Sequence, residues 1–364
     1  MGGEPSTRPK AAGQPKAGLA QRDAALPHKA RLSGGVLIVA PSWIGDTILM
    51  QPLLARLRER HPAVEIDVLA ASWSAPLLAR MPEVRGIIDS PFRHGRFDLG
   101  ARWRLGRQLA TKGYDQAFVL PNSWKSALPV WFAGIAKRTG FTGEARAVLL
   151  NDRRQLDPNA TPLLVERYAS LAEPPGSPLP KPLPAPRLTS SKDQQQAALA
   201  ALGLPTDGPG IVFCPGAEYG PAKRWPATHF ARLAQLMEGP VWLLGSAKDA
   251  PIGTEIERLS AGRARNLCGQ TTLEQAIDVI ASARCVVSND SGLMHIAAAL
   301  DRPLAALFGS SSPGYTPPLS PQARIISLGL ECSPCYKRQC PLTHLRCLVD
   351  LSPEQVAATL DPLT

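Results

Sequence analysis

Val36-Leu37-Ile38-Val39-Ala40 is a short apolar run, rich in β-branched residues and ended by Pro41, and a stretch with helical spacing follows it from Asp46 to His61. A strand, a loop and a helix in this order are typical of an α/β unit. The same alternation continues, with strands expected at 65–70, 86–89 and 116–120 and helices at 72–80 and 99–112. Strands that alternate with helices predict a parallel sheet with helices on its faces.

A proline-rich segment divides the chain. Seven prolines lie between Pro174 and Pro186, a density that disfavours helix and central strand and favours an extended connection. Beyond it the alternation restarts, with helices expected at 191–202, 227–238, 252–260, 272–282 and 292–300 and strands at 210–214, 241–245, 265–268, 285–288 and 304–308. We therefore predict a disordered tail over 1–30, a first α/β domain over 31–173, a linker over 174–190 and a second α/β domain over 191–364.

The composition excludes several classes of protein. Of 364 residues, 44% are hydrophobic and 19% are charged, which argues against wholesale disorder, collagen and coiled coil. No uncharged stretch approaches the ~18 to 20 apolar residues of a membrane-spanning helix. The net charge of +10 comes from the residues before position 200. A basic half suits nucleic acid, anionic lipid or another polyanion, although ordinary solubilisation explains it equally well.

The loops that follow strands are where ligands bind in open α/β sheets, so two such domains face to face would form a cleft between their loops. The first of these loops leads to Asp46 at an expected helix start. A carboxylate there is either a helix-capping or first-turn acid, or a general base at the mouth of the cleft. The helix terminus would lower its pKa, whereas loss of solvent would raise it.

Three loops of the second half could bind parts of a nucleotide. The loop after 210–214 contains Lys223 and Arg224, which either meet a phosphate or are solvated. The segment 288–295 passes from a strand through a polar turn into a helix start, an arrangement that favours phosphate binding. Residues 271–274 predict a capping box, and their loop could form a wall for adenine or ribose. The absence of a P-loop and of GxGxxG weakens NTPase and dehydrogenase functions.

Four of the seven cysteines, Cys332, Cys335, Cys340 and Cys347, cluster near the end of the chain, with His344 among them. Their spacing suits a four-ligand zinc site, while reduced structural thiols, a disulfide or an iron–sulfur cluster stay open. The other three cysteines stand singly in apolar runs, as small buried hydrophobes do. Since no secretory signal is visible, this usage suggests a reducing compartment.

Six motifs follow one another along the chain: residues 41–46 (PSWIGD), 120–127 (LPNSWKSA), 215–226 (PGAEYGPAKRWP), 245–249 (GSAKD), 288–295 (SNDSGLMH) and the cysteine block. Taken together and in this order, they resemble the heptosyltransferases of glycosyltransferase family 9, which use ADP-heptose. The 215–226 string and the cysteine block resemble more narrowly the members that add the second heptose of the lipopolysaccharide inner core. The resemblance runs from about position 36 to 356 and leaves out the tail and the linker.

The resemblance implies the GT-B arrangement, in which two Rossmann-like domains face a central cleft with their parallel sheets. It implies an inverting transfer of heptose from ADP-heptose to the first heptose of the inner core (heptosyl-Kdo2-lipid A), with no metal or other cofactor in the chemistry. Asp46 would be the catalytic base. The donor would be held by Glu218, Lys223, Asp249, Thr271, Asp290, Ser291, Gly292 and His295, and the acceptor by Gly45, Arg96, Asn122, Ser123 and Lys125.

The resemblance also implies where such an enzyme works. A lipid-borne acceptor implies a cytoplasmic protein with transient contact to the inner face of the inner membrane, and no nucleic-acid partner. The rival functions are a heptosyltransferase I or III with another acceptor, a non-catalytic nucleotide-sugar-binding protein and a GT-B-like epimerase. An anionic saccharide acceptor would account for the basic front half, which includes Arg93, Arg96, Arg102, Arg104, Arg107, Lys125, Lys137 and Arg138.

Overall fold

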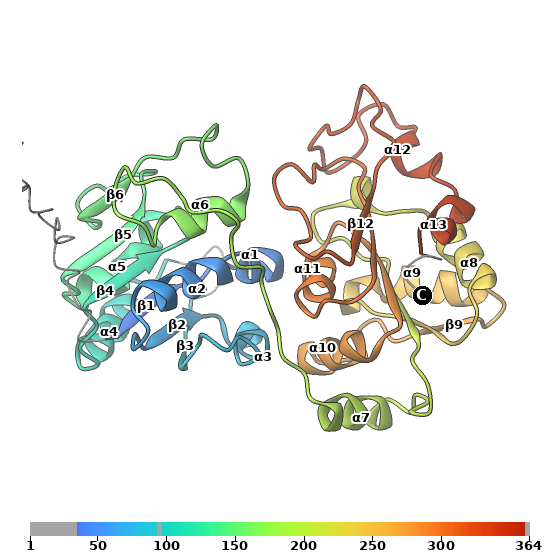
Figure 1. Ribbon diagram of the computed structural model, residues 1–364, viewed down its shortest axis with the longest axis horizontal. Helices are drawn as coiled ribbons and strands as arrows, with labels where there is room; N and C mark the ends of the chain where they lie inside the picture. Colours follow the sequence, from blue (N-terminus) through green and yellow to red (C-terminus); the bar gives the residue numbers. More distant parts are fainter. Residues whose placement is uncertain (1–34, 93–96, 361–364) are drawn as a thin grey trace, which may run out of the picture. The chain divides into compact units, whose positions relative to one another are not determined.

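The computed structural model describes residues 35–92 and 97–360. Its first half contains a six-stranded parallel sheet in the order β3-β2-β1-β4-β5-β6. Figure 1 shows this sheet in blue to green. The strands are β1 (Val36–Val39), β2 (Ile66–Ala70), β3 (Gly86–Asp89), β4 (Gln116–Val119), β5 (Lys137–Phe141) and β6 (Asp152–Arg154). The helices are α1 (Ile44–Leu49), α2 (Gln51–Arg60), η1 (Ser72–Ser74), α3 (Ala75–Leu78), α4 (Leu99–Ala110), α5 (Trp124–Phe132) and α6 (Leu164–Ser170).

The second half contains another six-stranded parallel sheet, in the order β12-β11-β10-β7-β8-β9. Its strands are β7 (Ile211–Cys214), β8 (Val241–Leu243), β9 (Ala264–Asn266), β10 (Cys285–Asn289), β11 (Leu304–Leu307) and β12 (Ala323–Ile326). Its helices are α7 (Lys192–Ala201), η2 (Pro221–Lys223), α8 (Ala227–Leu236), η3 (Ala247–Asp249), α9 (Ala250–Leu259), α10 (Leu273–Ser282), α11 (Gly292–Ala299), α12 (Arg346–Val349) and α13 (Pro353–Leu360). The predicted pair of parallel α/β sheets is confirmed.

The central strand β1 shows why the first sheet is buried on both faces. Val36 and Ile38 pack in one apolar cluster, while Leu37 and Val39 pack in another. Successive side chains of a strand point to opposite faces, so a continuous apolar run requires cover on both sides. Helices α4 and α5 contribute to the second cluster, and α1, α2 and α6 contribute to the first.

The expected helix over 46–61 is two helices in the structure. The first begins at Ile44, and Met50 lies between the two as the C-cap of α1 and the N-cap of α2. Pro52 stands in the first turn of α2, where its missing N–H costs least. The split leaves α1 as a short helix whose first turn carries Asp46.

Several elements were not predicted, namely β5, β6, β12, α5, α6, α12 and α13. Strands β5 and β6 are rich in Arg and Lys, and their sequences KRTGF and DRR lack the apolar run that predicts a strand. Between Ser170 and Lys192 the structure has neither helix nor strand, as the prolines indicate. The domain boundaries drawn from the sequence stay a prediction. In the described ranges, no helix combines the length and the apolar character needed to span a bilayer.

Candidate active site

Asp46 lies in the first turn of α1, directly after the loop that leaves β1. The N-cap of this helix is Trp43, and no side chain caps it. Asp46 is therefore not the capping residue that one interpretation of the sequence expected. Loss of solvent raises the pKa of Asp46 from 3.8 to about 6, and the positive charge of Lys223 opposes this rise. Burial thus outweighs the charge of Lys223, and the carboxylate is a stronger base than an exposed aspartate.

Lys223 ends the short helix η2 in the loop after β7, and Asp290 follows β10. The two strands are neighbours, so the parallel sheet brings both loops to one edge. Lys223 Nζ donates to Asp290 Oδ2 at 2.5 Å, and the hydroxyl of Ser311 donates to the same oxygen. Asp290 is buried, so it fixes the ammonium group in place. We predicted Asp290 among the donor-binding residues, and the structure gives it the role of holding Lys223.

The first turns of α1 and α11 are in contact, and glycine at two positions makes the contact possible. A Cβ on Gly45 would lie 2.8 Å from His295 Cδ2, and a Cβ on Gly292 would lie 2.7 Å from Ile44 Cβ. Both distances are shorter than real contacts allow, so larger residues would push the two helix starts apart. Gly45, Gly292 and His295 from the predicted site therefore meet in one place.

His295 is buried in the first turn of α11. Burial lowers its pKa to about 4, with the charge of Asp290 opposing and that of Lys223 adding to the effect. The imidazole is therefore neutral at pH 7. Ser291 is the N-cap of α11 but its side chain does not cap the helix; its hydroxyl lies 3.3 Å from that of Ser288. The free N–H groups of the helix start can accordingly meet an anion.

Asn289 holds the loop that carries Lys223, a role the sequence did not reveal. This side chain is fully buried at the end of β10. Its Nδ2 donates to the carbonyl of Pro215 at 2.8 Å, and its Oδ1 accepts from the backbone N–H of Trp225 at 3.1 Å. The amide thus joins both ends of the 215–226 loop to the central strand. The only signal was its place at the end of a buried strand, directly before Asp290.

Two of the remaining predicted donor residues, Asp249 and Glu218, have side-chain partners. Asp249 Oδ2 accepts from the backbone N–H and the hydroxyl of Ser246, and a Cβ on Gly216 would meet its carboxylate at 2.5 Å. Glu218 is exposed and pairs with Lys248. The predicted capping box at 271–274 is wrong by one residue, because Thr272 and Gln275 form it. Thr271 precedes that cap, in the loop after β9.

Asn122, one of the predicted acceptor residues, lies in the loop after β4. Its Oδ1 accepts from Arg146 Nη2 at 2.9 Å, and the fully buried Arg146 also donates to the carbonyls of Pro121 and Phe141. Arg146 therefore holds this loop in shape, and sequence reasoning missed it. Ser123 is the N-cap of α5.

Lys125, in the first turn of α5, lies 5.9 Å from the ring centre of Phe97, whereas Arg96 lies outside the described residues. Two of the basic residues assigned to an anionic acceptor serve the fold instead. Arg102 donates to the carbonyl of Lys125 at 2.7 Å, and Arg138 donates to the carbonyls of Ile135 and Leu149. Burial lowers the pKa of both guanidinium groups.

Two tyrosines near Asp46 were not predicted. Burial raises the pKa of Tyr168, on α6, and the charge of Asp46 raises it further. Burial also raises the pKa of Tyr315, with Arg167 opposing and Asp46 adding to the rise. The backbone N–H of Leu164 donates to the carbonyl of Tyr315, so the two segments are joined. Since α6 was not expected from the sequence, no pattern pointed to Tyr168.

The four terminal cysteines converge, as predicted. Cys332, Cys335, Cys340 and Cys347 line one small cavity of about 60 Å³ together with His344, and all are free thiols. Burial raises the pKa of Cys347, and the other three cysteines raise it further. In the described residues, however, no group of three or more His, Cys, Asp or Glu side chains is placed to hold a metal ion.

The cysteine block packs on the loop that carries Lys223. The sequence did not suggest this contact, because the block lies far from Asp46 along the chain. Ala222 lines the cysteine cavity, and its N–H donates to the carbonyl of Arg338 at 3.1 Å. The hydroxyl of Tyr219 donates to the carbonyl of Tyr336 at 2.9 Å. The block therefore supports the loop that carries the cation of the site.

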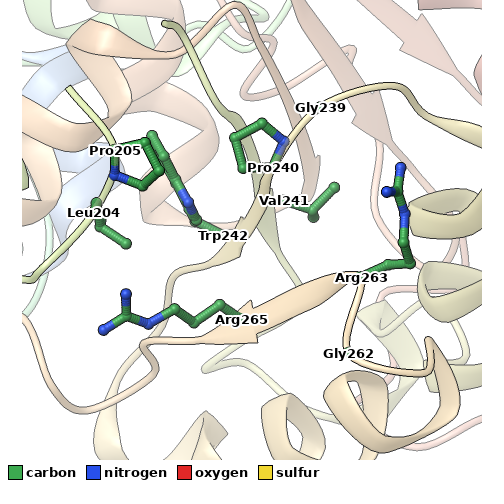
Figure 2. Close-up of a pocket in the computed structure, with 9 residues that line it drawn as sticks. All are labelled: Leu204, Pro205, Gly239, Pro240, Val241, Trp242, Gly262, Arg263 and Arg265. Carbon is green, nitrogen blue, oxygen red and sulfur yellow. The ribbon is translucent and has the colours of Figure 1, made fainter. Parts of the chain in front are cut away.

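A separate hollow of about 310 Å³ lies at the amino-terminal ends of β8 and β9, the opposite edge of the second sheet from Lys223. Figure 2 shows Trp242, Arg263 and Arg265 around it. Arg265 donates to the carbonyls of Leu202 and Gly203, and Arg263 donates to that of Met237. These arginines close helix ends, and the hollow contains none of the predicted site residues.

Comparison with known proteins agrees with this geometry. The family model described as glycosyltransferase family 9 (heptosyltransferase) matches residues 102–346. The chain is 48% identical over 340 residues to lipopolysaccharide heptosyltransferase 2 of Salmonella typhimurium, covering 90% of this chain and 98% of the relative. It is 46% identical over 344 residues to lipooligosaccharide heptosyltransferase 2 of Haemophilus influenzae, covering 90% and 99%.

A solved structure shares the whole arrangement. The ADP-heptose lipopolysaccharide heptosyltransferase II of Escherichia coli superposes with a TM-score of 0.81 at 46% identity, covering 90% of this chain and 98% of that chain. Both halves with their sheets are thus common to the two proteins, and the fold is GT-B. These similarities agree with the motifs, the two parallel sheets and the contact between the starts of α1 and α11. The chain therefore belongs to glycosyltransferase family 9, the heptosyltransferases.

Proposed function

We propose that this enzyme transfers a heptose from ADP-heptose to the first heptose of the lipopolysaccharide inner core, with inversion at the anomeric carbon. The observation that carries the proposal is the contact between the start of α1, which carries Asp46, and the start of α11, directly after the Asp290 that pairs with Lys223. Burial raises the pKa of Asp46 to about 6, which suits a base at this place. The names of the relatives at 46% to 48% identity favour the second heptose as the product.

Asp46 is the proposed general base. Inversion requires an acceptor hydroxyl to attack the anomeric carbon from the face opposite ADP. The bond from that oxygen to the anomeric carbon forms while the bond from the anomeric carbon to the phosphate oxygen breaks. The hydroxyl proton passes to Asp46 and ADP leaves with the electron pair. A pKa near 6 leaves the carboxylate mostly ionised at pH 7 and makes it a better proton acceptor than an exposed aspartate.

Lys223 and the start of α11 are proposed to bind the pyrophosphate of the donor. The departing diphosphate gains negative charge, so a fixed ammonium and helix N–H groups stabilise the transition state more than the ground state. Asp290 holds the ammonium at 2.5 Å and reduces the cost of ordering it. His295 is neutral and buried, which suits a hydrogen-bonding or packing role rather than that of a cation.

The acceptor would be presented by a lipid, so we place the enzyme in the cytoplasm, in transient contact with the inner leaflet of the inner membrane. The basic residues of the first half that remain exposed, such as Arg104 and Arg107, suit an anionic surface. No nucleic-acid partner is proposed.

One assay tests the proposed function: release of ADP from ADP-heptose, with and without heptosyl-Kdo2-lipid A. We expect release that depends on the acceptor, and a product larger by one heptose. Turnover only with another acceptor would assign the enzyme to the first or third transfer. Conversion of the nucleotide sugar without an acceptor would favour an epimerase, and binding without turnover would favour a non-catalytic protein.

We also propose a structural zinc on the terminal cysteines, as their spacing predicts. The thiols share one cavity but are not placed as a ligand set in this structure, so binding requires them to move closer. No catalytic step passes through this metal. Elemental analysis should find about one zinc per chain. Protein without zinc, in which all four native thiols are alkylated freely, would make these residues reduced structural thiols.

A further inference from the structure

Apolar side chains are exposed along α4 and next to it. Phe97, Leu99, Trp103 and Trp131 are exposed by 47, 49, 52 and 42%. Leu99 and Trp103 are one helical turn apart, and Arg107 follows by another turn, so the three share one face of α4. The opposite face is buried through Leu105 and Leu109. Helix α4 therefore carries apolar residues on its outer face as well as on its buried face.

Helix α5 extends this surface. It packs on α4 at Gly106, where a Cβ would lie 2.4 Å from Phe132 Cβ, and Figure 1 shows the two helices on the first sheet. The exposed Trp131 is the neighbour of Phe132 and contacts its ring edge-to-face, with the centroids 5.1 Å apart. We call the exposed residues of these helices and of the segment just before α4 the α4/α5 surface: Phe97, Leu99, Trp103, Arg104, Arg107 and Trp131.

The charge on this surface has one sign. Helix α4 carries three arginines and α5 one lysine, and neither helix contains an acid. Arg102 is buried and directed inward, which leaves Arg104 and Arg107 on the outside. The neighbouring Asp98 caps α4 by accepting from the backbone N–H of Ala101. Aromatic residues beside cations, on a helix lying flat, are characteristic of binding at the interface of an anionic bilayer.

We propose that the α4/α5 surface docks on the surface of an anionic phospholipid bilayer. The proposal rests on the proposed function, because it names the surface that would bring a lipid-borne acceptor to the site. Helices α4 and α5 follow the parallel strands β3 and β4 and so begin at the edge of the sheet that carries the Asp46 loop. Docking through these helices would keep that edge close to the headgroups.

Sedimentation with vesicles tests the surface directly. Vesicles of phosphatidylcholine with about a third phosphatidylglycerol should bind the enzyme, and vesicles of phosphatidylcholine alone should bind it much less. Arg104→Ala with Arg107→Ala should weaken binding about 25-fold, since each cation near the surface contributes about fivefold. Leu99→Ala with Trp103→Ala should weaken binding at high salt as well, where charge is screened. The matched control, Arg258→Ala with Arg324→Ala, removes two exposed arginines of the second half and should bind normally.

Assays of heptose transfer distinguish a failure of the docking surface from a failure of the proposed function. All variants should transfer heptose normally to an acceptor stripped of its acyl chains, and the two α4 variants should be slower only when the acceptor is in vesicles. Failure of the wild-type enzyme with both acceptors would refute the proposed function, while vesicle binding would still test the surface. Equal binding to both vesicle types, or normal vesicle binding by both α4 variants, would overturn the docking surface. A change of oligomeric state in these variants, measured by light scattering, would instead make it an interface between two copies.

Discussion

Replacing Asp46 by Asn should abolish most transfer and yet stabilise the protein at neutral pH. The carboxyl group has a pKa of 3.8 in the unfolded chain and about 6 in the fold, because burial penalises its charge. At 1.36 kcal/mol for each pKa unit, the ionised side chain costs the folded state about 3 kcal/mol above pH 6. Below about pH 3.8 both states hold the proton and the cost disappears. Stability therefore falls as pH rises between these values.

The assay is urea unfolding of wild type and Asp46→Asn at about pH 5 and about pH 8. The amide cannot ionise, so we expect the variant to be more stable, with the advantage growing by about 1.4 kcal/mol between the two pH values. Transfer should fall by ~10² to 10⁴, and wild-type activity should decline as pH falls through about 6. A variant that is less stable at about pH 8, with activity lost in proportion, would refute the reasoning and restore a structural role for the carboxylate.

Three further substitutions probe the surroundings of Asp46. Lys223→Ala should lower turnover by ~10² and move the acidic limb of the pH profile upward, because Lys223 lowers the pKa of Asp46; unchanged turnover and ADP affinity would refute its placement. Gly45→Ala should cost about 1 to 3 kcal/mol in thermal unfolding, since its Cβ would lie 2.8 Å from His295; normal stability would mean that the helix starts separate freely. Asn289→Ala should cost about 1 to 3 kcal/mol and raise the KM for ADP-heptose, as it leaves the buried carbonyl of Pro215 unpaired; a change in neither would contradict its role.

Most strands and helices were predictable because their signals are local. The apolar run of β1 is buried on both faces, and its β-branched residues favour extended backbone whatever surrounds them. The loops that carry Lys223 and His295 also stand out in the sequence, because they are polar stretches after apolar strands. Gly45 was named through the family resemblance, and the binding roles of all three stay predictions. The missed strands β5 and β6 are short and rich in arginine and lysine, and only pairing with their neighbours makes them strands.

The sequence by itself determined the two α/β halves, their parallel sheets and the loops that carry the site, because periodicity and β-branched residues act over a few positions. Only the tertiary structure decided the chemistry of those loops. Burial raises the pKa of Asp46, and a lysine far along the chain, Lys223, opposes that rise. The position of Lys223 depends in turn on Asp290 and Asn289. Charge, desolvation and buried hydrogen bonds join residues distant in sequence, and no local pattern records which of them will meet.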